Sequence, residues 1–149
     1  MAGLGLLGAG LVMGISAVGS AIGIGIAGQA AIGAWKRCYL NNKPAPMTLV
    51  TFAGAPLTQT FYGFITMMQI KNAAVANPGY AWLYLGFGIA SGLAMAFSAI
   101  AQGQAGAAAS DAQGETGKGF AQYISVVGIC ETVALFAMVL TMISLNVVA

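Results

Sequence analysis

A single carboxylate lies deep in an apolar segment of this chain. Glu131 is the only charged residue between Gly119 and Ala149. Placing a charge near the middle of a bilayer costs roughly 2.5–3.5 kcal/mol on insertion scales, so such residues usually bind an ion or a proton, or pair internally. The chemistry of this chain therefore depends on which groups neutralise Glu131.

A second polar group follows a proline in another apolar segment. Pro56 has no backbone N–H and disturbs the carbonyls one turn earlier in a helix. Thr58, Gln59 and Tyr62 come directly after it, at positions that fall within an arc of about 100° on a helix. These three side chains can therefore act together on one helical face.

The polar residues of separate helices are expected to meet at one depth. If the second helix begins near residue 47 and the fourth near residue 119, Gln59 and Glu131 each lie 12 residues in, which is roughly 18 Å along the axis. Gln102, in a third helix, lies within side-chain reach of that level. Hard cations choose oxygen ligands, and one carboxylate balances one monovalent cation. This favours a monovalent cation site; the alternatives are a proton on Glu131 and simple hydrogen bonding between helices.

The composition of the chain predicts the elements that hold these residues. Only 5% of its 149 residues are charged and 59% are hydrophobic, whereas about 25% of residues are charged in a soluble domain. Four stretches are nearly free of charge, and each exceeds the roughly 20 residues that a transmembrane helix needs: 1–35, 44–70, 72–110 and 119–149. The expected fold class is an all-α membrane protein with four transmembrane helices, some of them long enough to project beyond the bilayer.

The chain also contains an internal repeat. Residues 11–20 align with residues 85–94, and residues 59–64 align with residues 131–136, at offsets of 74 and 72. We therefore predict two tandem helical hairpins. The first spans residues 1–76, and the second spans residues 77–149 and carries Glu131. Gln59 takes the place of Glu131 in the first hairpin, so two hairpins share one carboxylate.

Small residues recur at intervals of four in the first and third helices, where they let membrane helices approach closely. Close packing of these two helices fits either a ring of many copies or a simple four-helix bundle in one chain. A GxGxxG spacing at residues 23–28 lies inside a helix with no preceding strand, which disfavours a dinucleotide site. The small residues at intervals of four are Gly10, Gly14, Gly19, Gly23, Gly88, Gly92 and Ala96.

Charged residues predict which side of the membrane each loop faces. Lys36, Arg37 and Lys43 fall between the first two helices, and Lys118 falls between the last two; only Lys71 lies near the middle connection. The positive-inside rule then places loops 1–2 and 3–4 in the cytoplasm and both termini on the opposite side. The sequence has no basic cluster with interleaved aromatic residues of the kind that would indicate nucleic acid binding.

The remaining polar residues suggest simpler roles. We expect Asp111 and Glu115 to be solvated loop charges, and Cys38, in a cytoplasmic loop, and Cys130, in the membrane, to be free thiols. Four serines of the apolar segments are expected to bond within their own helices, namely Ser16, Ser20, Ser91 and Ser98.

Three motifs give the whole chain a resemblance to a known family. They are residues 56–64 (Pro-Leu-Thr-Gln-Thr-Phe-Tyr-Gly-Phe), residues 100–104 (Ile-Ala-Gln-Gly-Gln) and residues 130–134 (Cys-Glu-Thr-Val-Ala). With the fused hairpins and glycine-rich odd helices, they resemble the proteolipid rotor subunit (K or c subunit) of V-type and V/A-type ATPases, most closely its sodium-translocating members. The resemblance implies that Na⁺ is bound by Glu131, Thr58, Gln59, Gln102 and the backbone carbonyl of Ala55. It also implies a hydrogen bond from Tyr62 to Glu131.

The same resemblance implies a rotary mechanism. Copies of the chain would form a homo-oligomeric ring among membrane lipids, beside a stator membrane subunit that carries an arginine, and would join the central-stalk subunits of the ATPase. Each Glu131 would carry Na⁺ across the membrane, with H⁺ as the alternative, coupled to ATP hydrolysis or synthesis. The chain has no P-loop motif, so it would be a non-catalytic, ion-translocating subunit.

Three other functions compete with the sodium rotor. A proton rotor would use Thr58, Gln59 and Gln102 only as hydrogen-bonding partners. A stand-alone four-helix secondary transporter would work as a dimer and would lack the tandem repeat. A purely structural membrane proteolipid would leave Glu131 without a coupled ion, so that Glu131→Gln would be silent in transport.

Overall fold

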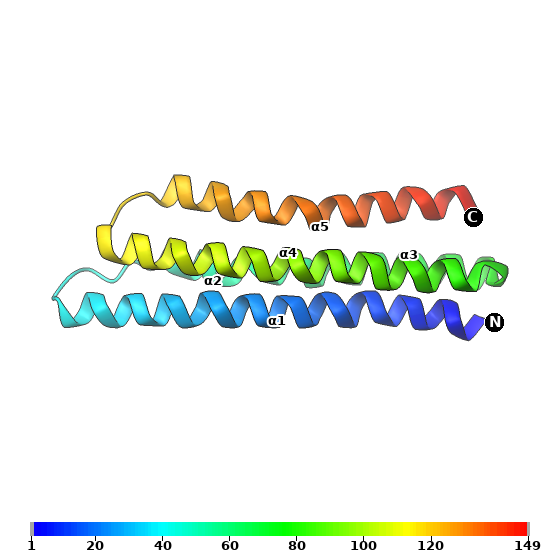
Figure 1. Cartoon of the computed structure of the whole chain (residues 1–149), viewed down its shortest axis with the longest axis horizontal. Coiled ribbons are helices and arrows are strands. Elements are labelled where there is room, and N and C mark those ends of the chain that lie inside the picture. Colours follow the sequence, from blue (N-terminus) through cyan, green and yellow to red (C-terminus); the bar gives the residue numbers. More distant parts are fainter. Residues whose placement is uncertain (1, 149) are drawn as a thin grey trace.

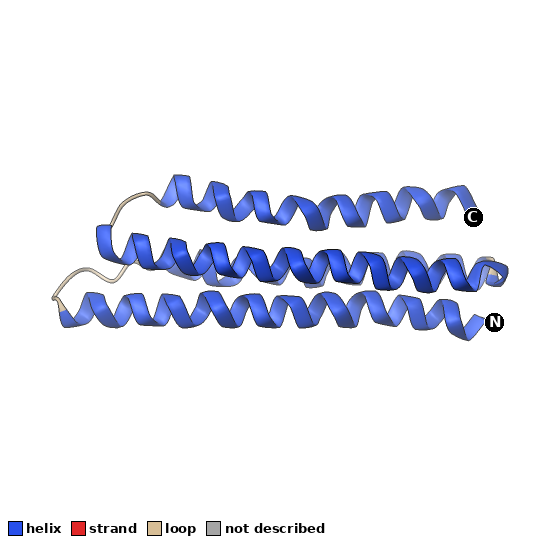
Figure 2. Ribbon diagram, in the orientation of Figure 1, coloured by secondary structure: helices blue, strands red, loops and turns tan. Residues whose placement is uncertain are grey.

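The computed structural model describes residues 2–148, which form four helical rods in two antiparallel hairpins (Figures 1 and 2). The first rod is α1 (Ala2–Leu40). The second consists of α2 (Leu49–Gly54), the 3₁₀ turn η1 (Ala55–Leu57) and α3 (Thr58–Ala76). The 3₁₀ turn η2 (Pro78–Tyr80) leads into the third rod, α4 (Ala81–Thr116), and α5 (Phe120–Val148) is the fourth. Residues 2–148 contain no strand.

The predicted fold class of an all-α membrane protein with four helices is confirmed, with one difference in the second rod. Three helical segments, Gly3–Leu40, Pro78–Thr116 and Phe120–Val147, are long and apolar enough to cross a membrane. With 39 residues, α1 is about 58 Å long, nearly twice the thickness of a bilayer core. The second rod is not a continuous apolar helix, because it is interrupted at Ala55–Leu57 and α3 contains several polar residues.

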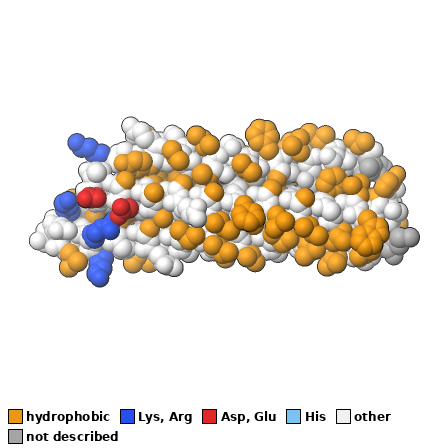
Figure 3. Space-filling model, viewed as in Figure 1, with side chains coloured by type: hydrophobic (Ala, Val, Ile, Leu, Met, Phe, Trp, Pro, Cys, Tyr) orange, Lys and Arg blue, Asp and Glu red, His pale blue; other side chains and the backbone are white. Residues whose placement is uncertain are grey.

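One end of the bundle carries the connections 41–48 and 117–119 and is named the loop end here. At this end, α1 and α4 extend further than the sequence predicted. Cys38 lies within α1, and Asp111 and Glu115 lie within α4, so none of them is in a loop. The helices end where the backbone changes conformation and not where the first charged residues occur. Asn42 and Gly117 adopt positive φ angles of 52° and 67°, and a residue in this conformation ends an α-helix. On the face seen in Figure 3, the charged side chains gather at this end, and apolar side chains are spread over the rest among backbone and other side chains.

The closest helix packing joins α1 to α4, as the small residues predicted. A Cβ on Gly88 would overlap the Gly8 carbonyl oxygen, and a Cβ on Gly103 would overlap the carbonyl oxygen of Gly23. The two backbones therefore touch at both levels. The absence of a side chain at these positions is what allows the two helices to approach so closely.

Two of the predicted interface glycines do not belong to this contact. A Cβ on Gly10 or Gly14 would have no neighbour within 4 Å, whereas one on Gly19 would overlap Ala96. The step of five residues from Gly14 to Gly19 turns the helix by about 140° from one face to another. The prediction that Gly10 and Gly14 pack between the first and third helices was therefore wrong. Gly8, which the intervals of four did not include, packs against α4 instead.

We predict that Gly103→Ala lowers the thermal stability of the detergent-solubilised protein, measured by loss of helical circular dichroism. Overpacking of this kind costs about 1–3 kcal/mol, because the new methyl group would overlap the Gly23 backbone. Gly10→Ala is the matched control: it adds the same methyl group where the chain leaves open space. Equal melting temperatures for the two variants would contradict the backbone contact.

Candidate functional site

Pro56 shapes the second rod where the polar residues begin. It is buried at the start of the 3₁₀ turn η1, where the Thr58 N–H donates to the Ala55 carbonyl. The Thr58 hydroxyl donates to the same carbonyl at 3.0 Å. The family resemblance implies a cation ligand at the Ala55 carbonyl. In the structure this oxygen accepts from these two donors, because the tightened turn brings Thr58 back onto it. A cation at this oxygen would have to displace the Thr58 hydroxyl proton.

Two fully buried glutamines connect the second rod to α4. The Gln59 amide nitrogen donates to the Gln102 amide oxygen at 2.9 Å, and both side chains have 0% exposure. The Gln59 amide oxygen faces the other way and lies 3.2 Å from the Thr58 hydroxyl oxygen, whose single proton is shared between this amide oxygen and the Ala55 carbonyl. Buried amides need such partners, because an unpaired polar group away from water costs about 1–3 kcal/mol.

Glu131 faces this network from α5. Its carboxylate accepts a hydrogen bond from the Tyr62 hydroxyl and another from the Gln102 amide nitrogen at 3.4 Å. The Glu131 side chain is half-buried, while its apolar neighbours Ile129 and Val133 are exposed on the outer side of α5. The one charge of this segment therefore points toward the other rods, where polar groups meet it.

The orientation of Gln102 follows from its main-chain partner. Its amide nitrogen donates to the Val127 carbonyl at 3.0 Å, and a carbonyl can only accept. The Gln102 nitrogen therefore faces α5 and Glu131, and its oxygen faces Gln59. Coordination of a cation by the Gln102 oxygen would require this amide to turn.

The structure joins the predicted site residues into one hydrogen-bonded series that runs from the second rod to α5. Among the predicted site residues that the structure describes, only Tyr62 and Gln102 form hydrogen bonds with the Glu131 carboxylate. Gln59 is linked to it through Gln102, and Thr58 and the Ala55 carbonyl are linked through Gln59. The series puts oxygen atoms beside a membrane carboxylate, which is a donor set suited to a hard monovalent cation or a proton.

Ser98 also belongs to this network, and the prediction that it bonds within its own helix was wrong. Ser16 and Ser91 do bond within their own helices, but Ser98 does not: its hydroxyl donates to the Cys130 carbonyl of α5. The prediction for Ser20 was also wrong, because its Oγ has no hydrogen-bond partner among the described residues. Ser98 lies one helical turn before Gln102, and that spacing was the available signal.

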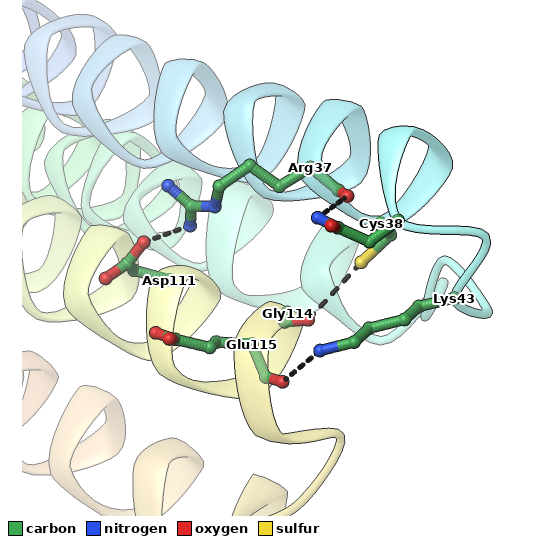
Figure 4. Close-up of a pocket in the computed structure, with 7 residues that line it drawn as sticks. Arg37, Cys38, Lys43, Asp111, Gly114 and Glu115 are labelled. Carbon is green, nitrogen blue, oxygen red and sulfur yellow. Dashed lines mark hydrogen bonds and ion pairs between the residues drawn. The ribbon is translucent and has the colours of Figure 1, made fainter.

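Four charged residues of the loop end, Arg37, Lys43, Asp111 and Glu115, line a separate pocket, drawn in Figure 4. Arg37 forms an ion pair with Asp111, and Lys43 Nζ lies 3.5 Å from the Glu115 carbonyl oxygen. Both side chains of the ion pair are more than half exposed, so the pair contributes about 0–1 kcal/mol. The Cys38 thiol donates to the Gly114 carbonyl at 3.3 Å, and both cysteines are free, as predicted.

Comparison with known proteins places the chain in a family. A family model that describes the C subunit of ATP synthase matches residues 7–70 and 85–144. The chain therefore belongs to this family, and the sequence-based identification as a rotor proteolipid is confirmed at that level.

A curated relative is "A-type ATP synthase subunit K" of Methanocaldococcus jannaschii. It is 33% identical over 144 residues, which are 95% of this chain and 61% of the relative. The chain thus spans about three fifths of that protein's length. The closer likeness to sodium-translocating members stays a prediction, as does the division into hairpins at residues 76 and 77.

We predict that Tyr62→Phe accelerates the labelling of Glu131 by a hydrophobic carbodiimide several-fold. The variant keeps the ring but removes the hydroxyl that holds the carboxylate toward the protein, so the carboxyl group becomes more accessible to the reagent. Tyr84→Phe is the control, because that buried hydroxyl donates to the Asn77 carbonyl, away from the site. An unchanged rate in Tyr62→Phe would show that this hydrogen bond does not restrain Glu131.

Proposed function

We propose that this chain is the rotor-ring subunit of a V/A-type rotary ATPase and carries Na⁺ across the membrane at Glu131. Membership of the family of ATP synthase C subunits supports the rotor. The observation that carries the proposal is the single membrane carboxylate of α5, held by Tyr62 and Gln102 at the end of a buried polar series. Copies of the chain would form a closed ring.

Charge and donor type support a monovalent cation. Glu131 supplies one negative charge, and the Thr58 hydroxyl, the Gln59 amide oxygen and the Ala55 carbonyl supply neutral oxygens on the facing rod. The filled site would be neutral, so it could face lipid at low cost, whereas a divalent ion would leave a net positive charge. Gln102 would join as a ligand by turning its amide.

The transport cycle follows from this neutralisation. An occupied Glu131 travels through lipid as the ring turns. At the stator, a membrane arginine competes for the carboxylate, since an opposite charge favours the ionised form. The ion is then released to the other side of the membrane. Loops 1–2 and 3–4 would face the cytoplasm and the central stalk, with both termini on the opposite side, and ATP chemistry would belong to other subunits.

One observation favours a second candidate, the same rotor carrying H⁺. Tyr62 and Gln102 both donate to Glu131, so they hold the carboxylate in place without a metal ion. In a proton rotor Thr58 and Gln59 would only support this arrangement. The two candidates share the ring and the mechanism, and they differ in what occupies Glu131 during rotation.

Transport by the reconstituted complex separates the candidates. In liposomes we expect ATP-driven uptake of radioactive sodium that persists with a protonophore and falls to background in Glu131→Gln. Glu115→Gln removes a carboxylate at the exposed loop end and should transport normally. Uptake that the protonophore abolishes would replace Na⁺ by H⁺ as the primary ion, and normal transport by Glu131→Gln would refute the rotor site altogether.

A further inference from the structure

We propose that Ser98 is a positioning residue of the ion site, one that orients the Gln59 amide and ties it to the main chain beside Glu131. The inference rests on the proposed function, because it assigns Ser98 a part in cation binding. Ser98 lies on α4 with 5% of its surface exposed. It is not a ligand in the set described above, and it acts through Gln59 and Cys130.

The Ser98 hydroxyl connects three rods at the level of the site. It accepts a hydrogen bond from the Gln59 amide nitrogen of α3 at 3.2 Å. It donates to the Cys130 carbonyl of α5 at 2.7 Å. Since Cys130 directly precedes Glu131, this short connection holds the backbone of the carboxylate against the residue that carries an oxygen ligand.

The direction of these two hydrogen bonds is fixed by chemistry. The Cys130 carbonyl can only accept, so the single hydroxyl proton of Ser98 must be donated to it. The Ser98 oxygen can then only accept from Gln59, which must present its amide nitrogen. The positions of the Cys130 carbonyl and the Ser98 hydroxyl therefore determine which end of the Gln59 amide faces Ser98.

A second main-chain carbonyl leads to the same orientation. The Val127 carbonyl requires the nitrogen of Gln102, so the oxygen of Gln102 faces Gln59 and again requires a nitrogen there. Both hydrogens of the Gln59 amide are thereby used, and its oxygen is left on the side of the Thr58 hydroxyl. Ser98 and Gln102 together make Gln59 present oxygen, and not N–H groups, to a cation.

Loss of the Ser98 hydroxyl should therefore weaken cation binding. In Ser98→Ala one Gln59 hydrogen loses its acceptor, and the amide is held only by Gln102. A turned amide would direct N–H donors at the cation. The net contribution of one buried hydrogen bond corresponds to about a 2- to 13-fold change in an equilibrium constant, so we expect the sodium dissociation constant of purified rings to rise by about this factor, measured by equilibrium binding of radioactive sodium.

The chain offers a matched control in Ser91. It lies two turns earlier on α4, has 4% of its surface exposed, and its hydroxyl donates to the Phe87 carbonyl of its own helix. Ser91→Ala should leave the sodium affinity unchanged. If Ser98→Ala and Ser91→Ala rings bind sodium equally well, Ser98 has no positioning role.

A spectroscopic measurement tests the Ser98 connection without sodium. The chain has two cysteines, so in a Cys38→Ser background a carbon-13 label on cysteine carbonyls reports Cys130 alone. We expect the infrared band of this carbonyl to move to higher frequency in Ser98→Ala, because a hydrogen-bond donor is lost, and to stay in place in Ser91→Ala. An unmoved band in Ser98→Ala would overturn the proposal.

Sodium binding and the infrared band of the Cys130 carbonyl together separate a failure of the sodium rotor from a failure of the role proposed for Ser98. Wild-type rings that bind no sodium would refute the proposed cation and, with it, the role of Ser98 in binding that cation. A band that moves while sodium affinity stays the same would overturn the positioning role and leave the sodium rotor intact. If Ser98→Ala rings assemble poorly, the isosteric pair Ser98→Thr and Ser98→Val isolates the hydroxyl: only the valine variant should bind sodium weakly and move the band.

Discussion

A carboxylate in an apolar layer must be neutralised, and this requirement organises the molecule around Glu131. Water is absent at that depth, so the neutralising groups have to come from the protein or from a carried ion. The Tyr62 hydroxyl and the Gln102 amide meet the carboxylate from two other rods. Their own buried partners extend the polar network to Gln59 and Thr58, so satisfying one charge determines a layer of the bundle.

Backbone packing brings these partners within reach. Gly23 of α1 would place a Cβ 2.9 Å from Pro56, and Gly103 of α4 touches the same Gly23 backbone. Gly103 directly follows Gln102, and Pro56 begins the turn that leads into Thr58 and Gln59. The tight contact of α1 with α4 and the break in the second rod therefore lie beside the polar network. Steric and electrostatic requirements meet at one level of the membrane.

Much of this arrangement could be predicted from the sequence, because long apolar segments and repeated motifs leave few alternatives. The four rods, the packing of α1 with α4 and the polar series near Glu131 follow from such patterns. Features that depend on local backbone geometry did not: the Ala55 carbonyl is occupied because η1 tightens the turn, and α1 continues to Leu40, two residues before the positive φ angle of Asn42. The hydrogen-bond partner of Ser98 was predicted wrongly because its acceptor is a main-chain carbonyl of another helix, and residue types in the sequence do not indicate such an acceptor.

The most direct test of sodium binding at Glu131 is the rate at which a hydrophobic carbodiimide labels this residue in purified wild-type rings, with and without Na⁺ at fixed pH. The reagent needs a protonated carboxyl group that is accessible from lipid, so an ion bound at Glu131 must compete with labelling. If Glu131 binds Na⁺, then Na⁺ slows labelling in a saturable way. A labelling rate that responds to pH but ignores Na⁺ would contradict the sodium site and leave a proton rotor in its place.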